Sequence, residues 1–349
     1  MPLSSVLELA LLLIGAGIAF VVGIWARPIG EAFGLLDHPD PAGGRKLHLQ
    51  ITPQVGGFAV VTAALLGVAV AAISGGVVGK PIDVAFWFAL TVLAMFLIGV
   101  IDDRAGLSAP LRLGITTTVL LLPILVVPDF LVSELHFAFA DLRFPLGLVG
   151  GAAFTLLCLV GLLNAVNMAD GKNGLVIGQA LIWALALSFR LPPELLPLIA
   201  ALVGALVVLL TFNCFGKLFL GDGGSYAISA IFGLLAVFAW NRSEGAFYAG
   251  DIVVIFALPV FDTLRLIVHR MLLGKSPFTP GRDHLHHYLH KRWGWPAPLP
   301  FVLGLVAFTN VGALMMPGTG LYWAGVTLVG YTVMLLAAAL PEPRASLRP

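Results

Sequence analysis

Residues 147–174 read GLVGGAAFTLLCLVGLLNAVNMADGKNG, an apolar run that ends in a cluster of polar side chains. A helix of about 20 apolar residues is long enough to cross the hydrocarbon core of a bilayer. Amide and carboxylate groups at the end of such a helix are costly to leave near lipid, and they therefore indicate a functional site by default. The stretch predicts a membrane-spanning helix with a chemically active end.

Apolar runs of this length recur along the chain, which is 59% hydrophobic and 11% charged and has a mean hydropathy of +1.02. Strands of a membrane β-barrel would alternate apolar and polar residues, whereas these runs are continuous, and backbone groups in lipid must pair within a helix. We therefore expect an all-α, polytopic integral membrane protein with a single transmembrane domain over residues 1–349. Eleven membrane helices are expected, at residues 4–26, 55–74, 83–101, 111–130, 147–166, 175–191, 195–213, 225–240, 248–272, 298–316 and 319–340.

Loop charge predicts the orientation of the chain. Of the 19 lysines and arginines, fifteen fall on one side of the eleven helices and four on the other. Cytoplasmic loops carry the excess of positive charge, so we expect the N-terminus outside and the C-terminus in the cytoplasm. The cytoplasmic loops would then be residues 27–54, 102–112, 164–174, 214–224 and 273–297. On the outer side, alternating residues over 134–144 predict a small β-hairpin, with an irregular amphipathic loop as the alternative.

The first cytoplasmic loop places Arg45, Lys46 and His48 among glycines and prolines. Anchoring at the membrane would account for the two basic residues alone. Gly56 and Gly57, which open the next helix, let a backbone or a ligand approach closely. This combination favours a phosphate-handling role for the loop.

The second loop opens with Asp102 and Asp103 and is followed by Arg112. Two adjacent carboxylates repel each other, which raises the pKa of one of them unless a cation is near. Metal binding, general-base chemistry and orientation of a basic residue all remain open for this pair. A solvated helix cap is the structural alternative.

The third loop is rich in oxygen ligands, because Asn164, Asn167, Asp170 and Asn173 fall within a few residues of one another. Asn164 and Asn167 share one face of the helix end. Mg²⁺ prefers oxygen ligands and often combines one or two protein groups with substrate phosphates. A helix C-cap explains Asn173 followed by glycine, but not the other three residues.

The fourth and fifth loops add a carboxylate, an aromatic ring and a group of donors. Asp222 precedes a predicted helix, so it is either an N-cap or part of a metal or phosphate site. Phe219 is suited to stacking on a base, with an interfacial anchor as the alternative. The fifth loop offers donors for a diphosphate or a sugar, and zinc is disfavoured because no cysteine is near. These donors are Arg282, His284, His286 and His287.

Taken in order, the five loops resemble the polyprenyl-phosphate N-acetylhexosamine-1-phosphate transferases over nearly the whole chain. Each motif is weak alone, but five in this order on one membrane face are specific. The motifs are Arg45-Lys46-x-His48 with Pro53 and Gly56-Gly57, Asp102-Asp103, Asn164-x-x-Asn167-x-x-Asp170-Gly-x-Asn173-Gly, Phe219-x-Gly-Asp222, and His284-x-His286-His287.

The resemblance implies a transmembrane enzyme of the bacterial inner membrane. In this family a polyprenyl phosphate, such as undecaprenyl phosphate, attacks the β-phosphorus of a UDP-N-acetylhexosamine and releases UMP, with Mg²⁺ or Mn²⁺ as cofactor. The resemblance implies a catalytic group of Asp102, Asp103, Asp170 and Asp222, with Asp222 and Asn167 as the metal ligands. It implies substrate contacts from Lys46 and His48 to the lipid phosphate, from Asn173 and Phe219 to uracil, and from Arg112, Asn164, Arg282, His284, His286 and His287 to the diphosphate and sugar.

One departure from the family pattern and one feature of the histidine loop refine these expectations. Many relatives carry aspartate at the position of Asn173, where an amide keeps uracil recognition but not a metal or base role. With Leu285 between the histidines, the loop resembles the branch of the family that uses UDP-GlcNAc and not the branch that uses UDP-MurNAc-pentapeptide, which leaves UDP-QuiNAc and UDP-FucNAc as alternatives. Direct attack is favoured, and a covalent aspartyl intermediate stays open.

Other classes of protein fit the sequence less well. A transporter of anionic solutes should carry ionisable residues midway along its helices, whereas here they gather at one end. The resemblance makes a homodimer the expected assembly. The chain has no nucleic-acid-binding motif, and we expect no nucleic-acid partner.

Overall fold

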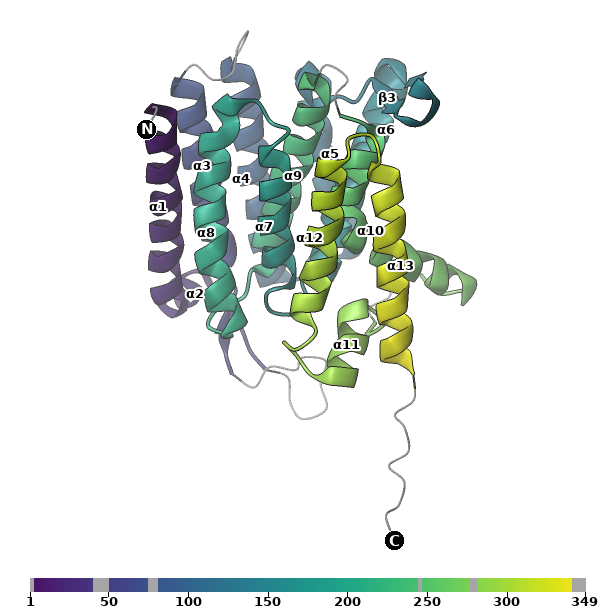
Figure 1. Ribbon diagram of the computed structural model, residues 1–349. Coiled ribbons are helices and arrows are strands. Elements are labelled where there is room, and N and C mark those ends of the chain that lie inside the picture. The colour runs from purple at the N-terminus through teal and green to yellow at the C-terminus, as the bar shows by residue number, and fades with distance from the viewer. Residues whose placement is uncertain (1–2, 40–49, 75–80, 244–246, 277–280, 341–349) are drawn as a thin grey trace.

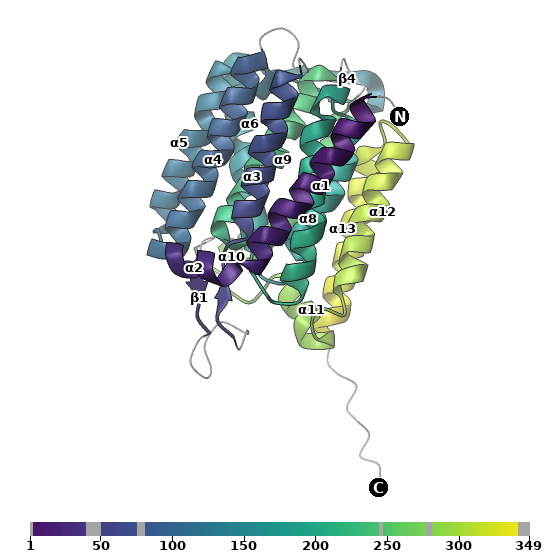
Figure 2. The ribbon, with the colours of Figure 1, turned by 90° about the vertical axis from the view of Figure 1, so that its left-hand side faces the viewer.

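The computed structural model describes residues 3–39, 50–74, 81–243, 247–276 and 281–340, and these form a bundle of roughly parallel helices (Figures 1 and 2). The helices are α1 (Leu3–Ile24), α2 (Ala26–Phe33), α3 (Gly56–Ile73), α4 (Pro81–Ala105), α5 (Ala109–Val126), α6 (Gly147–Ala169), α7 (Leu175–Ser188), α8 (Leu196–Cys214), α9 (Gly221–Arg242), α10 (Ala249–Leu272), α11 (Leu285–Trp293), α12 (Leu299–Met315) and α13 (Gly320–Ala339).

The predicted fold class is confirmed. Each of the eleven predicted apolar helices is present, with ends within four residues of those expected. Among the described residues, nine helices are long and apolar enough to cross a membrane, and α7 and α12 are shorter apolar helices. The sequence did not predict α2 and α11, because both are short and too polar to register as membrane spans.

The predicted β-hairpin is confirmed, and the irregular-loop alternative is wrong. Strand β3 (Glu134–Phe137) pairs with antiparallel β4 (Leu142–Pro145), with Phe137 opposite Leu142. Between the strands, Ala140 and Asp141 adopt positive φ angles of 60° and 47°, which reverse the chain. A second small sheet, β1 (Leu36–Asp37) paired with β2 (Thr52–Pro53), was not expected.

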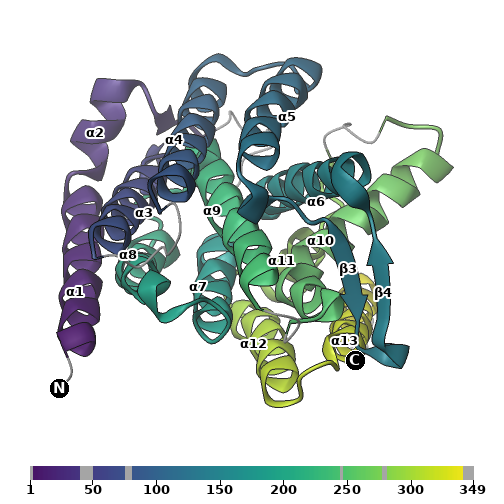
Figure 3. The same ribbon diagram turned by 90° about the horizontal axis from the view of Figure 1, so that it is seen from above.

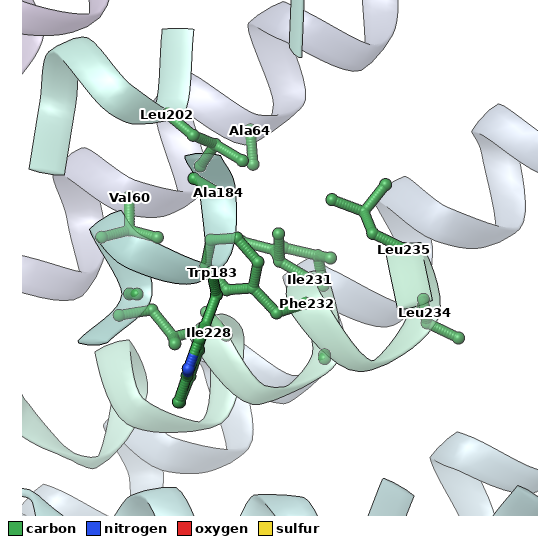
Figure 4. Close-up of a cluster of buried hydrophobic side chains, with 14 of the residues drawn as sticks. Val60, Ala64, Trp183, Ala184, Leu202, Ile228, Ile231, Phe232, Leu234 and Leu235 are labelled. Carbon is green, nitrogen blue, oxygen red and sulfur yellow. The ribbon is translucent and has the colours of Figure 1, made fainter. Parts of the chain in front are cut away.

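Helix α9 forms the centre of the bundle (Figure 3). In its most apolar stretch of 18 residues, 94% of the residues are buried. Small residues let other helices approach its first turn, since a Cβ on Gly99 of α4 would lie 2.4 Å from the Asp222 backbone. Further along, the Phe232 ring meets the fully buried Trp183 ring of α7 edge-on, with 5.8 Å between centroids (Figure 4). This tight packing fixes the position of the residues at the start of α9.

The polar loops gather at one end of the bundle. We call this end the polar end; it carries α2, α11 and β1–β2, and it is the end at which α13 finishes (Figure 1). Helix α1 begins at the opposite end, where the β3–β4 hairpin lies. The two ends of the described chain therefore lie on opposite sides, as an odd number of spans requires.

Candidate active site

A cleft of about 580 Å³ opens at the polar end. Segments from four of the five predicted cytoplasmic loops line it, although they are far apart in the sequence. The predicted site residues on its wall are Asp170, Asn173, Phe219, Asp222 and His287. The ends of four loops thus converge on one cleft in the structure.

Asp222 lies in the first turn of α9 and faces the end of α6. The Asn167 side-chain nitrogen donates to Asp222 Oδ1 at 2.6 Å and lies 3.2 Å from Ser225 Oγ. Leu220 occupies the N-cap position, and no side chain caps this helix end. The N-cap interpretation of Asp222 is therefore wrong, and the structure brings together the two residues expected to bind a metal.

Asp103, at the end of α4, lies beside the same helix start. Its Oδ1 accepts from Gln54 Nε2 at 3.2 Å, and its Oδ2 accepts from the Gly223 backbone N–H at 3.3 Å. A Cβ on Gly221 would lie 2.8 Å from Asp103 Oδ2, and Gly221 has a φ of +75°. Only glycine fits this close approach without strain.

Asp102 has a different environment from its neighbour. It is 6% exposed, and its Oδ2 accepts from Tyr226 Oη at 2.8 Å and from Arg112 Nη1 at 3.1 Å. Its Oδ1 accepts from the Leu107 backbone N–H at 2.8 Å. Neither Asp102 nor Arg112 lines the cleft, so the structure places this pair in a buried ion pair beside the site.

Asp170 ends α6 and completes a group of three carboxylates. Burial and the nearby Asp222 and Asp103 carboxylates raise its pKa well above the usual range. Within the described ranges, however, no three His, Cys, Asp or Glu side chains lie close enough to hold one metal ion together. A cation would have to combine Asp222 with the adjacent Asn167 amide, water and substrate phosphates, as Mg²⁺ commonly does.

The Asn167 amide sets a condition on this metal site. In the observed orientation its nitrogen, not its oxygen, faces Asp222. An ion bound by both residues requires the amide to turn so that its oxygen faces the carboxylate. The crowded carboxylates favour a cation here, because a positive charge would relieve their mutual repulsion.

The third, fourth and fifth loops are tied together near Asn173. Trp295 Nε1 donates to the Asn173 carbonyl at 2.9 Å. Asn213 Oδ1 accepts from the Gly174 N–H at 2.6 Å, and its side-chain nitrogen donates to the Leu218 carbonyl at 2.9 Å. Neither Trp295 nor Asn213 was expected from the sequence, although Asn213 ends an apolar run just as Asn164 does.

The first loop is joined to the fourth by backbone hydrogen bonds. The Phe219 N–H donates to the Pro53 carbonyl at 2.8 Å, and the Gly56 N–H donates to the Phe219 carbonyl at 3.0 Å. A Cβ on Gly57 would lie 2.6 Å from the Gly224 nitrogen, so this glycine permits the close approach expected of it. Gln54 lines the cleft at this junction, and no sequence signal identified it. Arg45, Lys46 and His48 lie outside the described residues.

The histidine segment is held by a carboxylate of α10. Asp262 accepts from His284 Nδ1 at 2.8 Å, from the Leu285 N–H at 3.1 Å and from Tyr331 Oη at 2.9 Å. Arg265 pairs with the same carboxylate at 3.0 Å. The Asp262 carboxylate thus holds both Arg265 and His284, and His284 is engaged in fixing the start of α11.

The remaining histidines of α11 differ in exposure. His286 is 3% exposed and packs against Gly171, where a Cβ would lie 2.3 Å from His286 Nε2. Burial and the neighbouring His287 and His284 lower the pKa of His286 well below the usual value. Burial, with His284 and Lys172 nearby, lowers the pKa of His287 to about 4. Both rings are therefore neutral at pH 7.

Asn164 and Arg282, like Asp103, His284 and His286, do not line the cleft. Asn164 donates to the Val160 carbonyl of its own helix at 2.8 Å. Arg282 is also absent from the cleft wall, although its charge acts on Lys172 and His287. The structure thus keeps Asn164 apart from the cleft and places Arg282 near its basic side.

An Asp262→Asn variant tests whether this carboxylate holds the histidine helix. We expect destabilisation by about 3–5 kcal/mol, because removing one partner of a buried ion pair leaves the other uncompensated. Thermal unfolding of the purified protein in detergent should show a lower midpoint. The matched control is Asp129→Asn, which breaks the more exposed Asp129–Arg242 pair at the opposite end and should change stability by less than about 1 kcal/mol. An equal midpoint for the two variants would contradict this role of Asp262.

Comparison with known proteins identifies the family of the chain. The family model described as glycosyl transferase family 4 matches residues 85–257. The chain is 31% identical to a decaprenyl-phosphate N-acetylglucosaminephosphotransferase of Mycolicibacterium smegmatis, over 95% of this chain and 89% of the relative. It is 29% identical to a probable undecaprenyl-phosphate N-acetylglucosaminyl 1-phosphate transferase of Bacillus subtilis, over 75% of this chain and 72% of the relative. It is 28% identical to the undecaprenyl-phosphate alpha-N-acetylglucosaminyl 1-phosphate transferase of Escherichia coli K12, over 83% of this chain and 79% of the relative.

The chain belongs to glycosyl transferase family 4. It is a multi-pass membrane enzyme that resembles the polyprenyl-phosphate N-acetylglucosamine-1-phosphate transferases of that family. The family resemblance drawn from the five loop motifs is confirmed.

Proposed function

We propose that this enzyme transfers GlcNAc 1-phosphate from UDP-GlcNAc to undecaprenyl phosphate and releases UMP. One observation carries the proposal: Asp222, Asp170, Phe219 and Asn173 converge on a single cleft from separate loops. The names of the relatives support transfer of a sugar phosphate to a polyprenyl phosphate. The Leu285 interruption favours GlcNAc over MurNAc-pentapeptide, as argued from the sequence, and UDP-QuiNAc and UDP-FucNAc are the alternative donors.

Transfer of the sugar phosphate to the lipid phosphate requires neutralisation of negative charge more than it requires a strong base. An oxygen of the lipid phosphate bonds to the β-phosphorus of the nucleotide, and the bond from that phosphorus to the bridging oxygen breaks, so that UMP leaves. The second pKa of a phosphate monoester is about 6, so the nucleophile is largely ionised at pH 7. Bound Mg²⁺ would neutralise charge as the two phosphates meet. Asp222, beside Asn167, is the group best placed to hold it.

Asp103 is the best candidate for aligning the incoming phosphate. Its carboxylate is fixed from two sides, by the Gln54 amide and the Gly223 N–H. It lies at the start of α9 next to the proposed metal ligand, and it can accept any proton that remains on the lipid phosphate. A covalent aspartyl intermediate is the alternative mechanism, and it would require one of these carboxylates to attack the β-phosphorus.

The uracil end of the cleft is assigned to Phe219 and Asn173. Both residues line the cleft, and the Trp295 bond holds the Asn173 backbone in place. An aromatic face stacks on a base, and an amide side chain can both donate to and accept from uracil.

An Asn173→Ala variant tests the uracil assignment. We expect UDP-GlcNAc to bind about tenfold more weakly, because a hydrogen bond to the base is lost and its partner is left unsatisfied. The KM for undecaprenyl phosphate should stay unchanged. Isothermal titration with uridine and with UDP-GlcNAc measures the loss. Unchanged affinity for uridine would remove the base-binding role of Asn173.

We also propose that the polar end faces the cytoplasm, where nucleotide sugars are made. The bias of lysines and arginines toward these loops supports this orientation. Cysteine-accessibility labelling in intact cells tests it: a cysteine introduced at Lys275 should be protected from a membrane-impermeant maleimide, whereas one at Arg143 in the β4 strand should react. The reverse pattern would overturn the orientation.

The activity itself is tested with purified enzyme, undecaprenyl phosphate and a panel of UDP-sugars, with and without Mg²⁺. UDP-GlcNAc should give UMP and a lipid-diphospho-sugar only when Mg²⁺ is present. UDP-QuiNAc, UDP-FucNAc and UDP-MurNAc-pentapeptide should react more slowly. Release of UDP in place of UMP would show transfer of the sugar alone and would overturn the proposed reaction.

A further inference from the structure

Lys172 is a half-buried cation on the wall of the cleft. It lies in the turn that follows α6, between Asp170 and Asn173. Burial and the Arg282 guanidinium lower its pKa, and among the described residues no carboxylate raises it. Within the part of the chain that the structure describes, the Lys172 ammonium has no ion pair.

The groups around Lys172 do not offset its charge. His287 and His290 line the same side of the cleft, and burial together with neighbours that include Lys172 lowers the pKa of both rings. They are neutral donors and acceptors at pH 7. Asp170, although adjacent in sequence, interacts with the carboxylates of Asp222 and Asp103. The cleft wall therefore carries the carboxylates of Asp170 and Asp222 and, at Lys172, a cation that no described carboxylate offsets.

An unpaired ammonium in a partly buried position is unfavourable unless an anion joins it. A phosphate is the anion that suits this wall, because the ammonium supplies a point charge and the neutral imidazoles supply further hydrogen bonds. Two phosphates are candidates: the diphosphate of the nucleotide sugar and the phosphate of the lipid.

We propose that Lys172 binds the diphosphate of the nucleotide sugar. This inference rests on the proposed function and adds a residue that the motifs did not identify. Lys172 immediately precedes Asn173, which the structure places with Phe219 at the proposed uracil end of the cleft. The diphosphate follows the uridine along the ligand, so Lys172 is positioned for the phosphates of the nucleotide and not for the lipid phosphate.

The test is a set of binding measurements on the full-length purified protein without the lipid acceptor. Isothermal titration compares uridine, UMP, UDP and UDP-GlcNAc on wild type and on Lys172→Met, which keeps the length of the side chain and removes its charge. We expect unchanged affinity for uridine and about 10- to 100-fold weaker binding of UDP and UDP-GlcNAc, the range for a lost charge-assisted hydrogen bond. Lys172→Arg should recover most of this affinity, and the exposed Lys275→Met serves as the control for loss of one positive charge.

Several outcomes would overturn the assignment. Equal weakening of uridine and UDP would show that Lys172 acts only by shaping the Asn173 turn. Unchanged nucleotide affinity with a raised KM for undecaprenyl phosphate would assign Lys172 to the lipid phosphate. Failure of the wild-type protein to bind any uridine nucleotide would overturn the proposed function as well, whereas normal wild-type binding with an unaffected variant overturns the role of Lys172 alone.

Discussion

Replacing Asp222 with asparagine is expected to lower kcat by about a thousandfold or more, the scale at which removal of a preorganised electrostatic contact reduces catalysis. The substitution keeps the shape of the side chain and its contact with Asn167, which lies 2.6 Å away. It removes the negative charge on which the proposed Mg²⁺ site depends. Steady-state assays of UMP release over a range of Mg²⁺ concentrations measure the effect.

The fold of the Asp222→Asn variant must be shown to be intact. Its thermal midpoint should match that of wild type, because α9 is held by burial along its length and not by this carboxylate. The Asp129→Asn control, at the far end of the bundle, should keep full activity. Wild-type turnover by Asp222→Asn, or an unchanged dependence on Mg²⁺, would remove the metal assignment.

The second large effect is expected from Asp103→Asn, with a fall in kcat of about 10²- to 10⁴-fold, the range for a group that aligns a reactant or accepts its proton. The KM for UDP-GlcNAc should change little, because Asp103 is assigned to the lipid phosphate and not to the nucleotide. Asp102→Asn should instead lower the thermal midpoint, since it weakens a buried pair with Arg112 and a bond from Tyr226.

We therefore expect experiments to distinguish the roles of the two adjacent aspartates. Steady-state kinetics and thermal unfolding of both single variants give the comparison. An active Asp103→Asn together with a stable but inactive Asp102→Asn would reverse their roles. A trapped phosphosugar on either aspartate, found by mass spectrometry of the enzyme incubated with UDP-GlcNAc alone, would favour the covalent mechanism over direct attack.

The sequence predicted the membrane helices well because continuous apolar runs have few structural solutions in lipid. It also indicated that the polar motifs share one side of the membrane, since the charged and amide residues all follow or precede spans at one end. It did not predict α11, because LHHYLHKRW is too polar and too short to register as a span. The helix starts where it does because Asp262 of α10 binds His284 and the Leu285 N–H.

The different roles of neighbouring residues could not be predicted from the sequence. Asp102 and Asp103 are equivalent in a motif, and only the rotation of α4 against α9 decides which one meets Tyr226 and which one meets Gly223. Gln54 and Trp295 carry no local signal at all, because their roles come from contacts with residues that are distant in sequence. The sequence also could not show that Lys172 lacks a counter-charge, because this depends on which residues pack around it in the fold.

The central claim is that one cleft holds a divalent cation and the nucleotide diphosphate together, with Asp222 as the protein ligand. The most direct measurement is ³¹P electron–nuclear double resonance on the enzyme loaded with Mn²⁺ and UDP. The account predicts one tightly bound Mn²⁺ with strong coupling to phosphorus in the wild-type protein, and loss of that bound ion in Asp222→Asn. Mn²⁺ that binds equally well to Asp222→Asn, or that shows no coupling to the phosphorus of UDP, would contradict it.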